Sequence, residues 1–167
     1  MRQHAMCMAS TLVVILVAGC GGDPGAMSEE HLAKMTVADF SLKSLDGETL
    51  TLSELHVRKP VLLDFSGTWC PPCTRAVPGV KRLHEAYGDS IAIIAIYDNR
   101  SAASIRNYVE EHEIEYPVAL DMDGSVARDY KVRGVPTFVV IGRDGSAKYY
   151  GHNVSAAGAI IEKELTR

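Results

Sequence analysis

The sequence has little of what marks several specialised classes of protein. Its 7 prolines and 14 glycines follow no period, which excludes a collagen-like chain. The 17 lysines and arginines are outnumbered by 21 aspartates and glutamates. At a net charge of −4, the chain therefore lacks the basic excess of nucleic-acid-binding proteins, and no nucleic acid is expected as a partner. With 4 cysteines in 167 residues, the chain is not a small disulfide-stapled scaffold either.

What the sequence does have is enough apolar residues for a hydrophobic core. Its hydrophobic fraction is 47% and its charged fraction 23%, with Leu, Ile and Val spread along most of its length. This composition excludes a disordered protein. The length fits one ordinary domain better than two, and the sequence contains no internal repeat or low-complexity tract.

The N-terminus has the pattern of a signal peptide. Arg2 is followed by an uncharged run of 14 residues, Ala5 to Ala18, which is shorter than the about 20 apolar residues that span a bilayer. The run ends in Val17-Ala18-Gly19-Cys20, which resembles the lipobox of bacterial lipoproteins. That resemblance implies cleavage before Cys20 and lipid attachment to this residue. A plain secretory signal, or an N-terminal helix that stays in place, are the alternatives.

Three segments follow from this reading: a signal peptide over 1–19, a lipid-anchored tether over 20–37 and a folded domain over 38–167. The tether has a Gly/Pro-rich start and little apolar periodicity, although Ser28 could cap a short helix within it. Two or three acyl chains on Cys20 would hold the protein stably on a membrane of the cell envelope. Gly follows Cys20 where Asp would signal inner-membrane retention, so the outer membrane of a Gram-negative cell is favoured.

The remainder of the chain alternates strand and helix patterns. Apolar residues recur at helical spacing near 76–87, 105–109 and 157–165. Strands are expected where apolar residues alternate or run continuously, with hairpin turns at Asp46-Gly47 and Asp144-Gly145: 39–42, 49–52, 61–65, 91–96, 116–120, 137–141 and 147–150. This order predicts an α/β fold, in which helices flank a mixed sheet that contains a right-handed parallel crossover.

The most informative motif is Trp69-Cys70-Pro71-Pro72-Cys73, which lies where a buried strand turns into a helix. Two cysteines three residues apart on a first helical turn can close a disulfide. The helix dipole and the unpaired backbone amides there favour the thiolate of Cys70. Thiol–disulfide exchange follows, with Cys70 attacking and Cys73 resolving. A structural disulfide or half of a zinc site are the alternatives, but no second Cys pair or His-x₃₋₅-His spacing completes a zinc site.

Motifs along 38–166 together resemble the thioredoxin superfamily. Within it, they resemble the membrane-anchored TlpA/ResA-like thiol–disulfide oxidoreductases, the redoxin or AhpC/TSA-related group. The motifs are Asp39-Phe40, Asp46-Gly47, 64–73, 116–121 and 134–137. The resemblance implies a thioredoxin-like three-layer sandwich, with a central mixed β-sheet flanked by helices, an N-terminal β-hairpin and a central insertion over 97–130. Peroxiredoxins share the general fold, but their Pro-x-x-x-Thr-x-x-Cys context is absent.

The resemblance also suggests roles for residues around the two cysteines. Asp64 matches the acid beneath the second cysteine, and in an apolar strand its pKa should be raised, which suits it to take the Cys73 proton. An ordinary strand-end Asp is the alternative. Pro136 matches a proline preceded by a cis bond, which would leave Val135 backbone groups facing Cys70 to dock an extended substrate.

Two further residues near the motif have matches in the family. Trp69 would flank the disulfide as a hydrophobic docking surface, with a simple core Trp as the alternative. Pro78 matches the helix-kinking proline of thioredoxins and is expected to be structural.

The residues between and after the cysteines bear on the direction of electron flow. Pro71 and Pro72 have no backbone N–H, so two donors are missing near the sulfur, although Arg75 one turn on could supply charge. This favours a reducing couple. Relatives that act in haem-protein maturation commonly carry Glu three residues after the second cysteine. Ala76 stands there in this chain, which speaks against a specialised reductant of apocytochrome cysteines.

The sequence therefore predicts a thiol–disulfide oxidoreductase of the cell envelope that faces the periplasm. We expect it to reduce several protein disulfides, to receive electrons from a membrane donor, and to need no cofactor or metal. The alternatives are a cytochrome c maturation reductant, a redox-silent binding protein and a copper metallochaperone. The intact cysteine pair and Asp64 argue against a redox-silent protein, and a copper chaperone of this fold would use Cys-x-x-x-Cys with a distal His.

Overall fold

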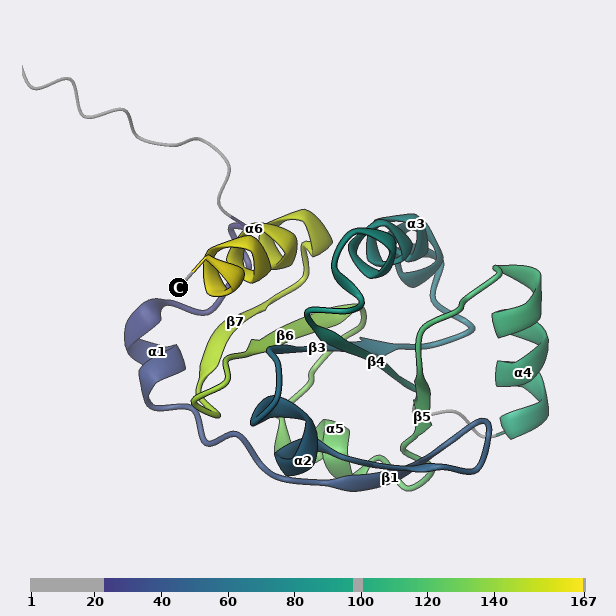
Figure 1. Cartoon of the computed structure of the whole chain (residues 1–167). Coiled ribbons are helices and arrows are strands. Elements are labelled where there is room, and N and C mark those ends of the chain that lie inside the picture. Colours follow the sequence, from purple (N-terminus) through teal and green to yellow (C-terminus); the bar gives the residue numbers. More distant parts are fainter. Residues whose placement is uncertain (1–22, 98–100, 167) are drawn as a thin grey trace, which may run out of the picture.

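A mixed sheet of seven strands forms the centre of the domain. The computed structural model describes residues 23–97 and 101–166, so the predicted signal peptide over 1–19 and Cys20 lie outside the described residues. The order across the sheet is β2-β1-β5-β4-β3-β6-β7. Figure 1 labels all of these strands except β2. The strands are β1 (Ser41–Ser44), β2 (Thr49–Thr51), β3 (Val61–Ser66), β4 (Ala92–Tyr97), β5 (Val118–Leu120), β6 (Thr137–Ile141) and β7 (Ala147–Gly151).

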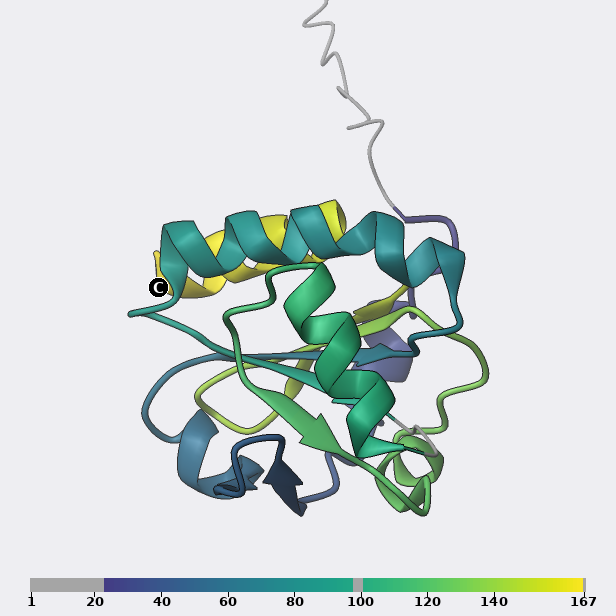
Figure 2. The ribbon, with the colours of Figure 1, turned by 90° about the vertical axis from the view of Figure 1, so that its right-hand side faces the viewer.

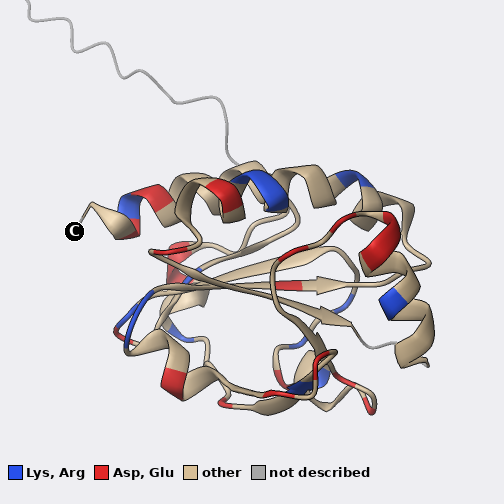
Figure 3. Ribbon diagram, turned by 45° about the vertical axis from the view of Figure 1, so that its right-hand side comes forward, with Lys and Arg blue, Asp and Glu red and all other residues tan. Residues whose placement is uncertain are grey.

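The central strands are apolar because both of their faces are covered. β3, β4 and β5 are parallel, whereas β6 and β7 and the β1–β2 pair are antiparallel. A strand buried on both faces reads as a nearly continuous apolar run, as β3 and β4 do. Asp64 is the one charged residue in these two strands. Figure 3 shows the other charges mainly on helices and loops.

Within the described residues, six helices cover the sheet. They are α1 (Glu29–Ala33), α2 (Leu52–His56), α3 (Pro71–Tyr87), α4 (Ala102–Glu111), α5 (Ser125–Asp129) and α6 (Val154–Leu165). Side chains of α3, α4 and α6 join one apolar cluster, and those of α2 and α5 join the cluster on the opposite face. Figures 1 and 2 show α3 and α6 side by side over the first face. The predicted three-layer sandwich is confirmed.

The predicted N-terminal hairpin and central insertion are present at one edge of the sheet. β1 and β2 pair across the Asp46-Gly47 turn, where Gly47 has a φ of +86° that a residue with a side chain rarely adopts. β1 also pairs with β5, and β5 pairs with β4. The insertion therefore supplies the strand that joins the hairpin to the central sheet.

Two short helices are not predicted by the sequence pattern. The alternation around Thr49 predicts a strand up to Leu52, but the strand ends at Thr51 and Leu52 begins α2. Leu52 is buried, and the Ser53 amide donates a hydrogen bond to Asp39 Oδ1 at 2.9 Å. This acceptor lies 14 residues earlier in the chain, so no local pattern reveals it.

The second of these helices, α5, depends on a buried carboxylate. Asp121 is fully buried and accepts hydrogen bonds from the amides of Val126, at 3.3 Å, and Ala127, at 2.8 Å. These bonds satisfy amides in the first turn that have no partner within the helix. The helix has only five residues, too few for a clear apolar periodicity in the sequence.

The segment predicted as a tether lies, in its described part, against β7. The Asp23 carboxylate accepts hydrogen bonds from the Tyr149 hydroxyl at 2.6 Å and from the amides of His152 at 2.8 Å and Asn153 at 3.2 Å. The Met27 amide donates to the Tyr150 carbonyl at 2.8 Å. From Asp23 onward, then, this segment is held on the domain.

A helix occurs near the place expected within this segment, but its start differs in detail. Ser28 stands at the N-cap position of α1, yet its side chain makes no capping bond to the helix backbone. Its hydroxyl instead hydrogen-bonds to Nδ1 of His31 at 2.7 Å. The prediction of side-chain capping by Ser28 is wrong, because the imidazole one turn later competes for the hydroxyl.

Candidate active site

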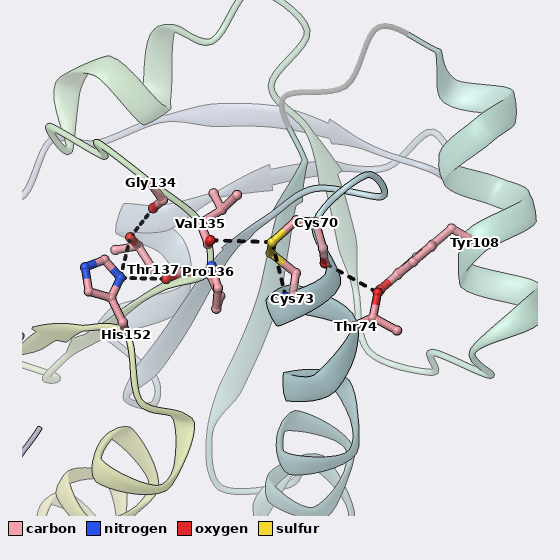
Figure 4. Close-up of a disulfide and its surroundings, with 9 residues drawn as sticks. All are labelled: Cys70, Cys73, Thr74, Tyr108, Gly134, Val135, Pro136, Thr137 and His152. Carbon is pink, nitrogen blue, oxygen red and sulfur yellow. Dashed lines mark hydrogen bonds between the residues drawn. A yellow bond between two sulfur atoms is a disulfide. The ribbon is translucent and has the colours of Figure 1, made fainter.

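Cys70 and Cys73 form a disulfide at the start of α3, with Cα atoms 5.2 Å apart. Cys70 is the N-cap residue, and two prolines follow at the first helical positions, where the missing N–H would have no partner in the helix. The Cys73 amide donates a hydrogen bond to Cys70 Sγ at 3.2 Å (Figure 4). The cysteine pair thus sits at the positive end of the helix dipole, as the motif predicts.

Few donors surround the Cys70 sulfur. Pro71 and Pro72 have no amide proton, so Cys73 supplies the backbone donor of this turn. Among the described residues, no basic side chain hydrogen-bonds to either sulfur. As predicted, the two prolines provide no backbone N–H donor to Cys70 Sγ, and the Cys73 amide is the backbone donor that remains.

In the oxidised state both cysteines are buried, with exposed fractions of 3% for Cys70 and 1% for Cys73. Their surroundings differ, however. Cys70 Sγ lies 3.4 Å from the Val135 carbonyl oxygen, on a neighbouring loop (Figure 4). Cys73 lies on the buried face of α3 together with Val77 and Val80, which points it toward the sheet. Attack by Cys70 and resolution by Cys73 stay predictions consistent with this arrangement.

Asp64 lies in the middle of β3, on the face that α3 covers. Side chains alternate along a strand, and Leu62, two residues before Asp64, belongs to the apolar cluster beneath α3. Asp64 is 4% exposed, and its Oδ1 has no hydrogen-bond partner among the described residues. Burial raises the pKa of Asp64 to about 7, the direction that the sequence predicts.

Three tyrosines surround this buried acid, and sequence reasoning does not single them out. Burial raises the pKa of Tyr97, Tyr108 and Tyr116, and the charge of Asp64 raises each of them further. The Tyr108 hydroxyl donates to Thr74 Oγ1 at 3.0 Å, which links α4 to the active-site helix (Figure 4). The Tyr116 hydroxyl is buried without a partner in the described part of the chain. Asp64 is thus flanked by phenols.

The loop opposite the disulfide contains the predicted cis bond between Val135 and Pro136. Two hydrogen bonds hold this loop: Nδ1 of His152 donates to the Pro136 carbonyl at 2.7 Å, and Oγ1 of Thr137 donates to the Gly134 carbonyl at 2.6 Å (Figure 4). His152 carries no sequence signal, because it lies in a loop and acts only through tertiary proximity. The loop presents the backbone of Val135 to Cys70.

Trp69 is exposed over 66% of its surface, so its alternative reading as a core residue is wrong. It borders a cavity of about 210 Å³ between the disulfide loop and the cis-proline loop. Other residues of this cavity are Phe65, Ser66, Asp121, Arg133, Gly134 and Val135. Trp69 and Val135 therefore lie on one depression next to the disulfide.

The described residues contain no group of three or more His, Cys, Asp or Glu side chains placed to hold a metal ion. Nor do they contain a helix long and apolar enough to cross a bilayer.

Comparison with known proteins places the chain in a family. The AhpC/TSA family matches residues 34–150, which is more than half of the chain. The chain belongs to the AhpC/TSA family. Its relatives include the thiol-disulfide oxidoreductase ResA of Halalkalibacterium halodurans, 33% identical over 148 residues, which are 86% of this chain and 84% of that protein. The thioredoxin-like protein YneN of Bacillus subtilis is 33% identical over 110 residues, and the match covers 64% of each chain.

Solved structures agree with this assignment. A putative thiol:disulfide interchange protein DsbE from Chlorobium tepidum is similar with a TM-score of 0.71 and 26% identity, over 77% of this chain and 94% of that one. StoA from Bacillus subtilis has a TM-score of 0.64 at 19% identity, over 75% of this chain and 98% of StoA, and shows the fold alone. With the Cys70–Cys73 pair in place, this AhpC/TSA protein is a thioredoxin-like thiol–disulfide oxidoreductase.

Proposed function

We propose that this protein reduces disulfides of other proteins in the cell envelope. The proposed direction of electron flow, from this protein to its client, is supported by the environment of Cys70 Sγ. There, two prolines leave Cys73 as the backbone donor of the turn. A thiolate with one backbone donor, and with no hydrogen bond from a basic side chain among the described residues, is only moderately stabilised. Its dithiol therefore gives up electrons more readily than that of a strong oxidant.

The proposed cycle has two exchange steps. The Cys70 thiolate attacks a client disulfide, one client sulfur leaves as a thiolate, and a mixed disulfide joins Cys70 to the client. Cys73 then loses its proton to Asp64 and attacks Cys70 Sγ, so that the client leaves with both of its cysteines reduced. Asp64 suits this role because burial raises its pKa to about 7 and because both residues face the interface of α3 and the sheet. A membrane electron donor would return the disulfide to the dithiol.

The client would dock as an extended segment beside the disulfide. Val135 offers backbone groups on the cis-proline loop, with its carbonyl 3.4 Å from Cys70 Sγ. Trp69 supplies an exposed apolar surface on the other side of the 210 Å³ cavity. Backbone pairing and a flat apolar contact select little for sequence, which fits several clients.

The membrane anchor belongs to this proposal as well. Lipid on Cys20 would keep the domain at a membrane surface facing the periplasm, with the outer membrane favoured in a Gram-negative cell. The support is the small-residue pattern before Cys20. Substituting Cys20→Ser should release the protein from the membrane fraction into the soluble fraction, and membrane association that persists unchanged would contradict the anchor.

Trapping the client tests the proposed function. A Cys73→Ser variant can attack but not resolve, so it should accumulate mixed disulfides between Cys70 and several unrelated envelope proteins, whereas Cys70→Ser should trap none. With limiting alkylating reagent, the reduced protein should be labelled at Cys70 before Cys73.

The reduction potential of the Cys70–Cys73 pair should lie nearer the about −270 mV of thioredoxin than the about −120 mV of DsbA. A potential near the latter value would make the protein an oxidant.

A cytochrome c maturation reductant is the second candidate, because the similar solved structures include a putative DsbE. Ala76 departs from the Glu that such relatives commonly carry. Deletion of this protein should leave several envelope proteins over-oxidised and c-type cytochromes only mildly reduced in amount. Loss of c-type cytochromes as the sole effect would favour the second candidate.

A further inference from the structure

A second, larger cavity adjoins the one beside the disulfide. Its volume is about 750 Å³, and its walls are the N-terminal segment around α1 on one side and 129–134 with β7 on the other. Arg133 and Gly134 line both cavities. The depression that starts at Trp69 therefore continues past the cis-proline loop to α1.

Most of the charged residues that line the larger cavity are basic. The basic side chains are Lys34, Lys131 and Arg133, with two histidines, against the single acid Asp129. Lys34 forms an ion pair with Glu30 at 2.6 Å, but Lys131 and Arg133 make no ion pair within the described part of the chain. Because the whole chain has a net charge of −4, this positive lining is a local feature.

The α1 wall is fixed to the domain by specific bonds. Asp23 accepts hydrogen bonds from Tyr149, His152 and Asn153, and the Met27 amide donates to the Tyr150 carbonyl. α1 itself, which begins two residues after Met27, also contacts β7. The larger cavity is thus part of the folded domain rather than a gap beneath a loose tail.

We propose that this cavity binds the part of an extended client that flanks its cysteine, and that it selects clients with acidic side chains there. The proposal rests on the proposed function, because the client must first dock at Val135. A strand paired with Val135 and continued toward Arg133 places alternate side chains on one face, about 7 Å apart. A client residue two positions from the one opposite Val135 then comes near Arg133. Lys131 lies in the turn that ends α5, with a φ of +55°, and its side chain lines the larger cavity only.

Continuity with the redox site favours a protein client over a free anion or a lipid headgroup. Arg133 lies two residues from Val135, whose carbonyl is 3.4 Å from Cys70 Sγ. The cavity also contains apolar surface from Met27, Met35 and Tyr150, which suits side chains of a polypeptide better than a small inorganic ion.

Three matched peptides test the selection. Each carries one cysteine blocked as a mixed disulfide with neutral 2-mercaptoethanol. The positions two and four residues from this cysteine, on both sides, are all Glu in the first peptide, all Gln in the second and all Lys in the third. The reduced full-length protein converts each to free peptide thiol and free 2-mercaptoethanol, while its own dithiol becomes the disulfide. At low salt, the Glu peptide should react about threefold to tenfold faster than the Gln peptide, the effect of one or two exposed charge pairs, and the Lys peptide should be slowest.

Charge reversal at the cavity should reverse this order. The double variant Lys131→Glu/Arg133→Glu should prefer the Lys peptide, while Lys43→Glu should keep the wild-type preference. Lys43 is a suitable control because it lies on β1, at the opposite side of the sheet from β7. A Glu preference that persists in the double variant, or that is absent from the wild-type protein, would overturn the proposal.

The outcomes separate this inference from the proposed function. If the wild-type protein reduces the Gln peptide and 2-hydroxyethyl disulfide but shows no charge preference, only the selection by the cavity is wrong. If it reduces neither, the proposed function fails. A lipid outcome is also possible to distinguish. The Cys20→Ser protein would then bind vesicles of anionic lipid, the double variant would not, and no peptide would be preferred. That result would assign the cavity to lipid headgroups and overturn the proposal.

Discussion

At the scale of single residues, two buried carboxylates show how neighbours decide a role. Asp121 is fully buried and accepts two backbone hydrogen bonds, so it stabilises the start of α5. Asp64 is 4% exposed, but its Oδ1 has no partner among the described residues. A buried carboxyl group without a hydrogen-bond partner is costly to ionise, and this cost raises its pKa toward neutral pH. The same type of side chain stabilises a helix start in one place, whereas in the other it has the raised pKa that the proposed proton transfer from Cys73 requires.

Replacing Asp64 should change how the free energy of unfolding depends on pH. With a pKa of about 7 in the folded protein and 3.8 in the unfolded chain, Asp64 binds a proton only in the folded state between these values. The contribution of Asp64 to stability is therefore highest below about pH 4 and falls as the pH rises through 7. Relative to Asp64→Asn, the oxidised wild-type protein should lose up to about 4 kcal/mol of unfolding free energy between pH 4 and pH 8. Urea titrations at the two pH values measure this difference.

Catalysis and a matched variant complete this test. Asp64→Asn should slow resolution of the mixed disulfide by about tenfold or more at pH 7, since a general base is lost. Asp121→Asn should instead cost about 1–3 kcal/mol of stability, because it weakens bonds to two buried amides. An unchanged rate of resolution in Asp64→Asn would reduce Asp64 to a structural residue.

At the scale of elements, the start of α3 sets the chemistry of the sulfur. A helix beginning at Cys70 would ordinarily direct several amides at the N-cap side chain, but Pro71 and Pro72 remove two of them. The prolines still suit the helix geometry, because their fixed φ matches the first turn. The N-terminus of α3 therefore has regular helical geometry but offers few N–H groups to stabilise the Cys70 thiolate.

Restoring a donor at this position should make the couple more oxidising. Pro72→His returns an N–H and adds an imidazole near Cys70, which stabilises the thiolate and hence the reduced form. A hydrogen bond to a charged group contributes about 1.5–3 kcal/mol, which corresponds to a rise of about 30–60 mV in the reduction potential. Equilibration with glutathione at known ratios measures this shift.

The control for that prediction lies in the same helix. Pro78 is inside α3, five residues after Cys73 and more than a full turn away, so Pro78→Ala should leave the potential within a few millivolts of the wild-type value. A Pro72→His protein with an unchanged or more negative potential would show that missing donors do not set the direction of electron flow.

At the scale of the whole molecule, the N-terminal segment is part of the fold. Asp23 connects it to β7 and to the loop that carries His152, and His152 in turn holds the Pro136 carbonyl of the cis-proline loop. Burial alone would raise the pKa of Asp23. Hydrogen bonds from Tyr149 and from three backbone amides outweigh this effect, and the pKa is lowered.

Removing the Asp23 charge should loosen this connection in a pH-dependent way. A carboxylate whose pKa is lowered by folding stabilises the protein above its unfolded pKa of about 3.8 and loses this contribution as the pH falls through the folded value. Asp23→Asn should therefore cost about 1 kcal/mol of unfolding free energy at pH 7, discounted for solvent exposure, and little at pH 3. Denaturant titrations at both pH values measure this, and an equal cost at both would contradict a role for the charge.

Local sequence patterns predict the α/β class and the redox motif, and the resemblance to the thioredoxin superfamily adds the buried acid and the cis-proline loop. These depend on local patterns: apolar runs for β3 and β4, and short motifs around Cys70, Asp64 and Pro136. The hairpin at Asp46-Gly47 was equally predictable, because its turn needs a residue that adopts a positive φ. Each of these features is encoded within a few neighbouring residues.

The pairing of residues far apart in the sequence depends on tertiary packing. The helix at Leu52 depends on an acceptor at Asp39, the cis-proline loop on His152, and the course of the N-terminal segment on Tyr149. In each case a backbone or hydroxyl group finds its partner 14 or more residues away. A buried polar group must be satisfied wherever a partner lies in space, and no local pattern records that position.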